Sequence, residues 1–315
     1  MIRRLPLVAI VAGSAAMAQQ GSPQVGAPGR DSGADVRSAE GPQAGVSLNL
    51  GGVYSFGSDL SDGPGDVAVT RAFAGVAARF PVLEATQLTL GIESEYSWYD
   101  FSGATAFAPS GEPWDDVQEI ALSLGVQHRV SEQWTVTVGG TIDSSLEIGA
   151  DFGDSLTYGG AIGAVYSFSE DLSLGLAVGI RSQLEDDVLV LPLPVIDWRI
   201  NERWRVGSVR DFGVVGLGVT FTPSEKWSFV LSSGVQAREF RLDDEGAAPD
   251  GVGRDWRVPI ALRAGYTVTP NFVVAVFGGV DVWGELTLDD RNGNEIAEDE
   301  LEPAAFVGGG VTIRF

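Results

Sequence analysis

The sequence predicts an all-β protein whose antiparallel strands close into a transmembrane barrel, and three observations predict it. Amphipathic segments with a period of two recur from about residue 46 to the carboxyl terminus. The connections between them alternate between short polar turns and longer acidic loops, an asymmetry typical of transmembrane β-barrels. After the first twenty positions no apolar run reaches the ~18 residues that a membrane-spanning helix needs.

The amino-terminal segment predicts export. Two arginines precede the apolar run Leu5–Ala16, which ends in small residues, so we expect residues 1–18 to be a signal peptide cleaved after Ala18. Residues 19–45 are rich in Gly, Pro, Ser and Gln and lack periodicity, which predicts a disordered linker. This linker either hangs in the periplasm or folds back into the lumen. Residues 46–315 are then one barrel domain.

The short turns share one layout, in which a few polar residues separate two large apolar ones. Val130–Trp134, Phe168–Leu172 and Ile200–Trp204 are examples. We expect these turns on the periplasmic side, where their apolar neighbours form an aromatic girdle. The girdle residues are Phe80, Trp134, Phe168, Trp204, Phe221, Trp227 and Phe272. The longer segments expected on the external side are 57–66, 100–116, 149–154, 185–187, 243–255 and 285–302.

The strands number about fourteen, an even count as such barrels require, with about twelve as the alternative. The count depends on dividing Trp204–Thr222 into a short outgoing strand and a returning one. Within a strand such as Val117–Val130 the apolar residues keep to one parity and the charged residues to the other. Pro192 and Pro194 break the pattern because proline cannot donate to a strand ladder. We expect a bulge, a rim position or an inward bend there.

The final strand ends the chain on an aromatic residue. Val311, Ile313 and Phe315 share its apolar face. The pattern resembles the closing strand of bacterial outer-membrane β-barrels, in which this strand is also the assembly signal.

Three stretches resemble a family of bacterial outer-membrane β-barrel proteins of unknown function with porin-like barrels. They are LPLPVIDWRINERW at Leu191–Trp204, AREFRL at Ala237–Leu242, and Gly284–Phe315, which contains GELTLDDRNGNEI. The resemblance implies the outer membrane of a Gram-negative bacterium as the location. It transfers no catalytic residue.

Composition limits the partners. The formal charge of −23 repels nucleic acid, so none is expected as a partner. The absence of cysteine excludes a disulfide scaffold and a cysteine zinc site. The expected partners are outer-membrane lipid and the barrel-assembly machinery, and the oligomeric state stays open.

Catalysis is not predicted. The single histidine, His128, lies on the apolar parity beside a short turn, with no nucleophile pattern around it. No G-x-S-x-G element is present. We therefore expect no enzyme, no catalytic residue and no cofactor.

One acidic loop is a candidate cation site, although we expect no metal. Its oxygen donors at Asp289, Asp290, Asn292 and Asn294 miss the spacing of an EF-hand. The alternative is a solvated loop built on an Asn-Gly turn.

The main candidate site is the lumen, where charged side chains project inward. In an open barrel, acidic and basic walls would set up a transverse field, and the protein would be a passive channel for small solutes. If the charges instead pair and fill the lumen, the protein is a structural or adhesive barrel with cation- or partner-binding acidic loops. The lumen-lining candidates are Glu93, Glu95, Glu119, Asp143, Arg199, Arg205, Arg257, Arg263 and Arg314.

Overall fold

The computed structural model describes residues 44–109, 112–186, 188–211 and 214–315. The predicted signal peptide, 1–18, lies outside the described residues, as does the predicted linker, 19–45, except for its last two positions. The strands are β1 Gly45–Asp59, β2 Asp66–Leu83, β3 Thr86–Ser102, β4 Asp116–Arg129, β5 Trp134–Glu147, β6 Leu156–Ser167, β7 Leu172–Arg181, β8 Leu189–Arg199, β9 Trp204–Asp211, β10 Val214–Ser224, β11 Trp227–Arg241, β12 Val252–Thr269, β13 Phe272–Asp289, β14 Glu295–Leu301 and β15 Ala304–Arg314. One 3-10 turn, Gly153–Ser155, precedes β6.

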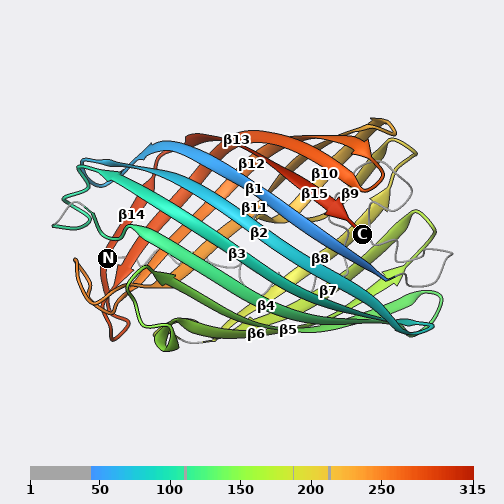
Figure 1. Ribbon diagram of the computed structural model, residues 1–315, viewed down its shortest axis with the longest axis horizontal. Helices are drawn as coiled ribbons and strands as arrows, with labels where there is room; N and C mark the ends of the chain where they lie inside the picture. Colours follow the sequence, from blue (N-terminus) through green and yellow to red (C-terminus); the bar gives the residue numbers. More distant parts are fainter. Residues whose placement is uncertain (1–43, 110–111, 187, 212–213) are drawn as a thin grey trace, which may run out of the picture.

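The strands form a closed antiparallel barrel in which each strand follows its sequence neighbour (Figure 1). β15 closes the ring because it pairs with β13 on one side and with β1 on the other. β14 pairs with no other strand than β13 among the described residues, apart from a single bridge between Leu301 and Leu60 after β1, and it lies beyond the wall. Fourteen strands therefore make the barrel. The predicted fold class and strand number are confirmed. The region at 204–222 does divide into two strands, β9 and β10.

The two ends of the barrel differ, as the alternation of connections predicts. Six short turns gather at the end where β1 begins and β15 finishes, which we call the turn end. Phe315 and Val46 exchange two backbone hydrogen bonds there, of 2.8 and 3.2 Å. The opposite, loop end carries the longer connections, apart from the tight link between β9 and β10. The prediction of a loop over 285–302 is wrong, because most of it is the β13–β14 hairpin.

The outward face carries the apolar side chains that a membrane requires. Aromatic rings gather outside at the turn end, where Trp134 lies 5.1 Å from Tyr166 and Trp204 lies 4.6 Å from Phe221, measured between ring centroids. Toward the loop end, the tilted rings of Tyr96 and Trp98 lie 4.5 Å apart between centroids. Between these groups lie exposed leucines, isoleucines and valines. No helix among the described residues is long and apolar enough to cross a membrane.

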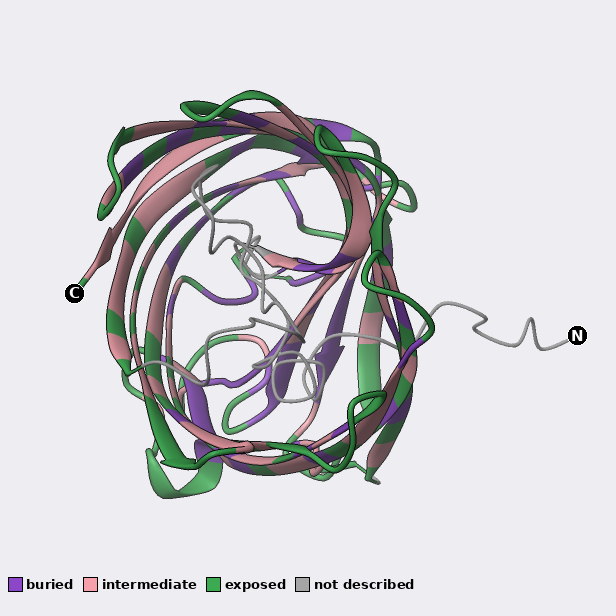
Figure 2. Cartoon of the chain, turned by 90° about the vertical axis from the view of Figure 1, so that its right-hand side faces the viewer, coloured by how far each residue is buried: buried purple, intermediate pink, exposed green. Residues whose placement is uncertain are grey.

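At the loop end the long strands extend past the barrel wall and pack around a hydrophobic core. The core joins β2, β3, β11 and β13 to the loop after β3, which contributes Phe107 and Trp114. Phe240 is fully buried in it, and Gly253 on the neighbouring strand makes room, since a Cβ there would lie 2.4 Å from the Phe240 ring. β11 also crosses the mouth to pair with β5 at Arg241 and Leu146. Seen from the turn end, buried segments of chain cross the interior of the ring (Figure 2).

β8 and β9 pair only at the turn end of their length. The register runs from Arg199 to Asp197 on β8 and stops there, whereas β7 pairs with β8 along the whole of both strands. Pro192 and Pro194 cause no bulge on the β7 side. The expected irregularity therefore lies in the seam with β9.

The core at the loop end generates a stability prediction. Phe240→Ala should lower the free energy of unfolding by about 3–5 kcal/mol, because it opens a cavity in a packed core. Urea titration in detergent, followed by the heat-modifiable gel shift, measures the loss. Phe56→Ala, an exposed outward aromatic, is the control and should cost less than about 1 kcal/mol. Equal losses for the two variants would contradict a packed loop-end core.

Candidate functional site

The centre of the lumen holds a buried network of arginines and carboxylates. The Asp255 carboxylate accepts hydrogen bonds from Arg71 Nη2 at 2.6 Å, from Arg257 Nε at 2.8 Å and from the Tyr99 hydroxyl at 3.0 Å. Arg257 also reaches Asp281 at 3.5 Å. Asp255 is fully buried and Arg257 nearly so. Each charge has an opposite partner, as burial away from water requires.

This network extends across the lumen to β3. Arg238 on β11 forms a two-point contact with Glu95, with Nε–Oε1 at 2.6 Å and Nη2–Oε2 at 3.2 Å. Arg71 Nε lies 3.8 Å from the same carboxylate. Planar pairing of this kind fixes both side chains in orientation. The pairs therefore tie β2, β3, β11 and β12 together directly beneath the loop-end core.

A second network lies at the loop end. Arg254 contacts Glu239 at 3.0 Å and also pairs with Asp289. Arg241 binds Glu185, in the loop after β7, at 2.7 Å. Its guanidinium also donates to the backbone carbonyl of Asp154 at 3.1 Å. These contacts join strands and loops across the mouth, which narrows the loop end.

The lumen is more open toward the turn end. Glu93 keeps 51% of its side chain exposed while it pairs with Arg210 of β9 at 2.7 Å. Arg205 pairs with Asp197 at 2.5 Å and stays 30% exposed. Solvent therefore reaches charged groups in this part of the barrel.

The predicted lumenal acids lie in the interior, but the arginines that pair with them are not the predicted lumen-lining arginines. Asp143 pairs with Arg181 at 2.5 Å. Glu119 lies across from Glu95 in the β3–β4 register. Glu93, Glu95 and Asp143 are thus held by Arg210, Arg238 and Arg181, none of which was among the predicted lumenal arginines.

The predicted arginines are spread over the length of the barrel. Arg199 pairs with Asp171 of a short turn at 2.7 Å and is exposed. Arg257 belongs to the buried network, and Arg263 lines a cavity. Arg314 is half-buried near the end of β15. They do not form one basic wall opposite the acids.

For two of the arginines that the sequence analysis missed, alternation along the strand gives different answers about whether the side chain points inward. Arg238 has the same parity as the inward-facing Gln236, so alternation along β11 predicts an inward side chain. Arg210 has the parity of the exposed Trp204, which alternation would place outside. It contacts Glu93 only because the end of the β9–β10 pair lies inside the barrel.

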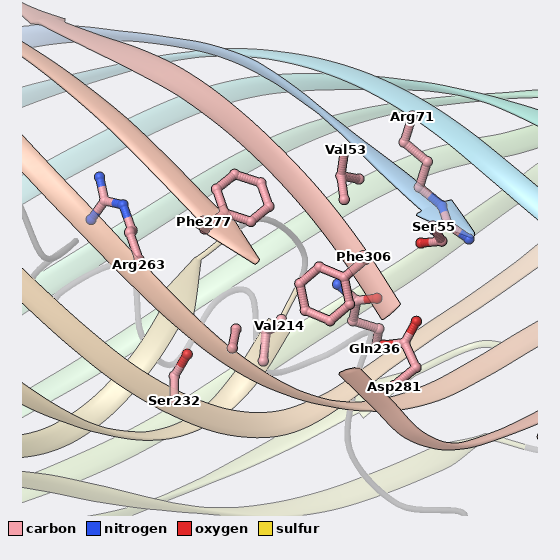
Figure 3. Close-up of a pocket in the computed structure, with 11 residues that line it drawn as sticks. Val53, Ser55, Arg71, Val214, Ser232, Gln236, Arg263, Phe277, Asp281 and Phe306 are labelled. Carbon is pink, nitrogen blue, oxygen red and sulfur yellow. The ribbon is translucent and has the colours of Figure 1, made fainter. Parts of the chain in front are cut away.

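The surroundings of the first two residues of β10 show where this strand lies relative to the barrel wall. Val214 lines the cavity shown in Figure 3, together with Phe277 and Phe306 of the facing wall. Val215, on the opposite face of the strand, packs against the inward-facing Leu191 of β8. A strand within the wall buries only one face against the interior. Both faces of β10 contact the interior at this level, so the strand lies within the lumen.

Two glycines lie where β10 enters the lumen beside β11. A Cβ on Gly216 would lie 2.0 Å from the Ser233 carbonyl oxygen, and one on Gly234 would lie 2.2 Å from that of Val215. β10 and β11 therefore approach each other more closely there than side chains allow.

The cavity beside Val214 is small, about 30 Å³. At roughly 10–15 Å³ for each water molecule, it holds about two waters. Its lining combines apolar side chains and aromatic rings with a few polar groups. The lining residues are Val53, Ser55, Arg71, Val214, Ser232, Gln236, Ala261, Arg263, Phe277, Asp281 and Phe306.

The candidate cation loop does not present its donors together. Asp289 is buried and pairs with Arg254. Asp290 accepts hydrogen bonds from the backbone amides of Asn292 and Asn294, at 2.8 and 3.0 Å. These bonds, with those from the Asn294 side chain, lower the pKa of Asp290 to about 2. Among the described residues no group of three or more His, Cys, Asp or Glu side chains is arranged to hold a metal.

The remaining predicted residues lie on the outer surface. His128 is exposed, and its Nδ1 lies 2.9 Å from the Thr86 hydroxyl. Val311 and Ile313 of β15 stand opposite Val274 and Phe272 of β13. Phe315 is 75% exposed at the turn end. Its side chain is thus accessible to another molecule, while its role as an assembly signal stays a prediction.

The buried network predicts a large difference between two Asp–Arg pairs. Asp255→Asn leaves Arg71 and Arg257 without their shared counter-charge, so the free energy of unfolding should fall by about 3–5 kcal/mol. Asp171→Asn breaks the exposed pair with Arg199 and should cost less than about 1 kcal/mol. Urea unfolding of both variants is the measurement. A smaller loss for Asp255→Asn than for Asp171→Asn would contradict a structural network.

The β13–β14 hairpin beyond the wall predicts a pH dependence. Burial, followed by the charges of Glu298, Glu300 and Glu295, raises the pKa of Glu285 to about 7. An unfolded glutamate titrates near ~4.3, so the folded state binds this proton more tightly. Stability should therefore be highest below pH ~4.3, fall as the pH rises to ~7, and then level off. Glu285→Gln should reduce the loss of melting temperature between pH 5 and pH 8.

Glu202→Gln, in a short turn at the opposite end, is the matched control and should keep the wild-type profile. If wild type and Glu285→Gln show the same pH profile, the clustered glutamates do not control it.

Comparison with known proteins identifies a family and finds solved structures of low similarity. No curated protein matches the chain. Among solved structures, an outer membrane channel from Pseudomonas putida F1 aligns over 87% of this chain and 96% of its own, with 9% identity and a TM-score of 0.48. A Pseudomonas aeruginosa FadL homologue aligns over 96% and 99%, with 11% identity and a TM-score of 0.46.

The KdgM porin, in complex with disordered oligogalacturonate, aligns over 85% of this chain and 99% of its own, with 10% identity and a TM-score of 0.38. At such identities the likeness concerns the fold, and no substrate is carried over. The family model of a domain of unknown function, DUF6268, matches residues 111–314. The chain therefore belongs to the DUF6268 family.

Proposed function

We propose that this protein is a passive channel for small solutes in the outer membrane of a Gram-negative bacterium. The observation that carries the proposal is the solvent-accessible lumen toward the turn end, where the inward-facing Glu93 keeps half of its side chain exposed. The outward aromatic groups at two levels support a membrane location. The amino-terminal signal pattern supports export, with the turn end facing the periplasm.

The proposal includes no catalytic role. His128 is on the outer surface, and Thr86 is the partner of its ring. Buried carboxylates such as Asp255 are occupied by arginines, which leaves them unsuited to proton transfer. The lumenal charges are proposed to act on solutes through their field.

The closed loop end favours a second candidate, a structural or adhesive barrel with a filled lumen. The core around Phe240 and the Arg241 contacts block a straight path to the outside. A structural barrel would pass no solute, so the two candidates differ in a measurable property.

Permeation by the refolded protein, residues 19–315, tests the proposal. In planar bilayers we expect discrete conductance steps of small size, because the loop end narrows the path. In Gram-negative cells the barrel should also accelerate hydrolysis of a hydrophilic β-lactam by a periplasmic β-lactamase. A barrel that migrates as folded on gels yet gives neither conductance nor solute uptake would support the structural candidate instead.

The field of the lumen predicts a change in ion preference. Glu93→Gln leaves Arg210 as an uncompensated cation, so the cation-over-anion permeability ratio should fall by at least about twofold. Reversal potentials in a salt gradient measure this ratio. Glu225→Gln, in an exposed turn, is the control and should leave it unchanged. An unchanged ratio in Glu93→Gln would show that ions do not pass this side chain.

A further inference from the structure

The seam between β8 and β9 lacks a backbone ladder over most of its length. Pairing covers Arg199↔Arg205, Trp198↔Val206 and Asp197↔Gly207 and then stops. If the register continued, Ile196 would face Ser208, and Pro194 would face Arg210. Every other neighbouring pair in the wall is joined over a longer stretch.

Several polar groups at this edge are bonded or absent. The Ile196 amide donates to the Ser208 hydroxyl at 3.0 Å, and that hydroxyl donates to the Pro194 carbonyl at 3.1 Å. Residues of one parity turn their backbone groups to the same neighbour, so the nitrogens of Pro192 and Pro194 also face β9. Proline has no N–H to leave unpaired. Each bonded or absent group lowers the cost of an open edge inside a bilayer.

The seam lies at the depth of the hydrocarbon. On β7, the residues opposite Ile196, Pro194 and Pro192 are Leu174, Leu176 and Val178. All three of these β7 side chains are exposed on the outer surface. The outer rim of the seam is therefore apolar.

The inner rim is apolar as well, which is unusual for the inside of a barrel. Leu191, Leu193 and Val195 of β8 point inward and are buried with Val215 of β10. The adjacent residue, Val214, lines the lumenal cavity. One strand thus separates the inner rim of the seam from the cavity.

We propose that the β8–β9 seam is a lateral passage by which small apolar solutes move between the membrane and the lumen. This inference rests on the proposed channel function and names its solute class. On the β8 side an apolar solute contacts Leu191, Leu193 and the outward prolines, and no charged residue stands between Leu191 and Ile196. The nearest charge on the β9 side, Arg210, is already paired with Glu93. The core around Phe240 narrows the loop end, so a lateral path avoids that constriction.

The alternative ligand for an unpaired strand edge is a peptide that binds as an added β-strand. Strand addition depends on alternating N–H and C=O groups along the edge. At Pro192 and Pro194 no N–H is present, and the Ile196 N–H and the Pro194 carbonyl are already bonded to Ser208. The edge is therefore unsuited to a peptide partner.

Uptake by Gram-negative cells that express the full chain tests the passage. The apolar probe is 1-N-phenylnaphthylamine, an uncharged fluorophore that brightens inside membranes and is slowed by the lipopolysaccharide layer. The polar probe is the hydrophilic β-lactam. Leu193→Asp places a charge on the inner rim and should slow apolar uptake about tenfold while β-lactam uptake stays within about twofold of wild type. Ser123→Asp, an inward position on β4 away from the seam, should leave apolar uptake unchanged.

The second variant closes the β8–β9 seam reversibly with an engineered disulfide. The chain has no cysteine, so Pro194→Cys with Arg210→Cys introduces one pair at positions that would face each other across the seam. Oxidation should slow apolar uptake, and reduction of the same protein should restore it. If the disulfide does not form, the Leu193→Asp result decides.

The outcomes separate the two proposals. Apolar uptake that is barrel-dependent and sensitive to both seam variants supports the passage. Barrel-dependent β-lactam uptake with apolar uptake indifferent to Leu193→Asp overturns the passage and keeps the channel. If neither probe enters faster with the folded barrel than without it, both proposals fail.

Discussion

Hydrogen bonding of the backbone inside the bilayer is the constraint on which this structure depends. The hydrocarbon offers no partner to an N–H or C=O group, so strands that cross it must pair on both sides. β15 meets this requirement by pairing with β13 and β1, which closes the ring. The fixed order of the strands, and the sorting of side chains into inside and outside, follow from that closure.

The same constraint explains why Pro192 and Pro194 are compatible with a closed barrel. A central strand with two prolines would normally lose two ladder bonds. In β8 the nitrogens of both prolines face β9 at a level where the β8–β9 ladder has already ended. The Ser208 hydroxyl accepts a hydrogen bond from the Ile196 amide and donates one to the Pro194 carbonyl. The prolines thus stabilise a seam that would otherwise expose unpaired donors.

The interior follows a second rule, that buried charge needs an opposite partner. Arg71, Arg238 and Arg257 are neutralised by Glu95, Asp255 and Asp281, and the network ties together strands from opposite sides of the lumen. Above it the loop end is narrowed by an apolar core, and below it solvent reaches the lumen. The barrel is therefore constricted by packing at one end and accessible to solvent at the other.

Alternation alone was enough to predict much of this fold. It placed Glu93, Glu95, Glu119 and Asp143 inside. The division of 204–222 into two strands came instead from the even strand count that keeps all short turns at one end. Alternation failed for 285–302 because an acidic hairpin that extends past the membrane has the composition of a loop, yet Leu286 and Leu288 bury one face of it. It also failed for Arg210, whose parity points outward.

The sequence by itself determined the fold class, the two unlike ends and the inward or outward direction of most wall side chains, because a period of two is a local property. Only the tertiary structure decided which charges pair, that the loop end is constricted, and that β10 enters the lumen. Those features depend on strands brought together around the ring, such as β3 with β11 at Glu95 and Arg238. Their separation along the chain leaves no local signal.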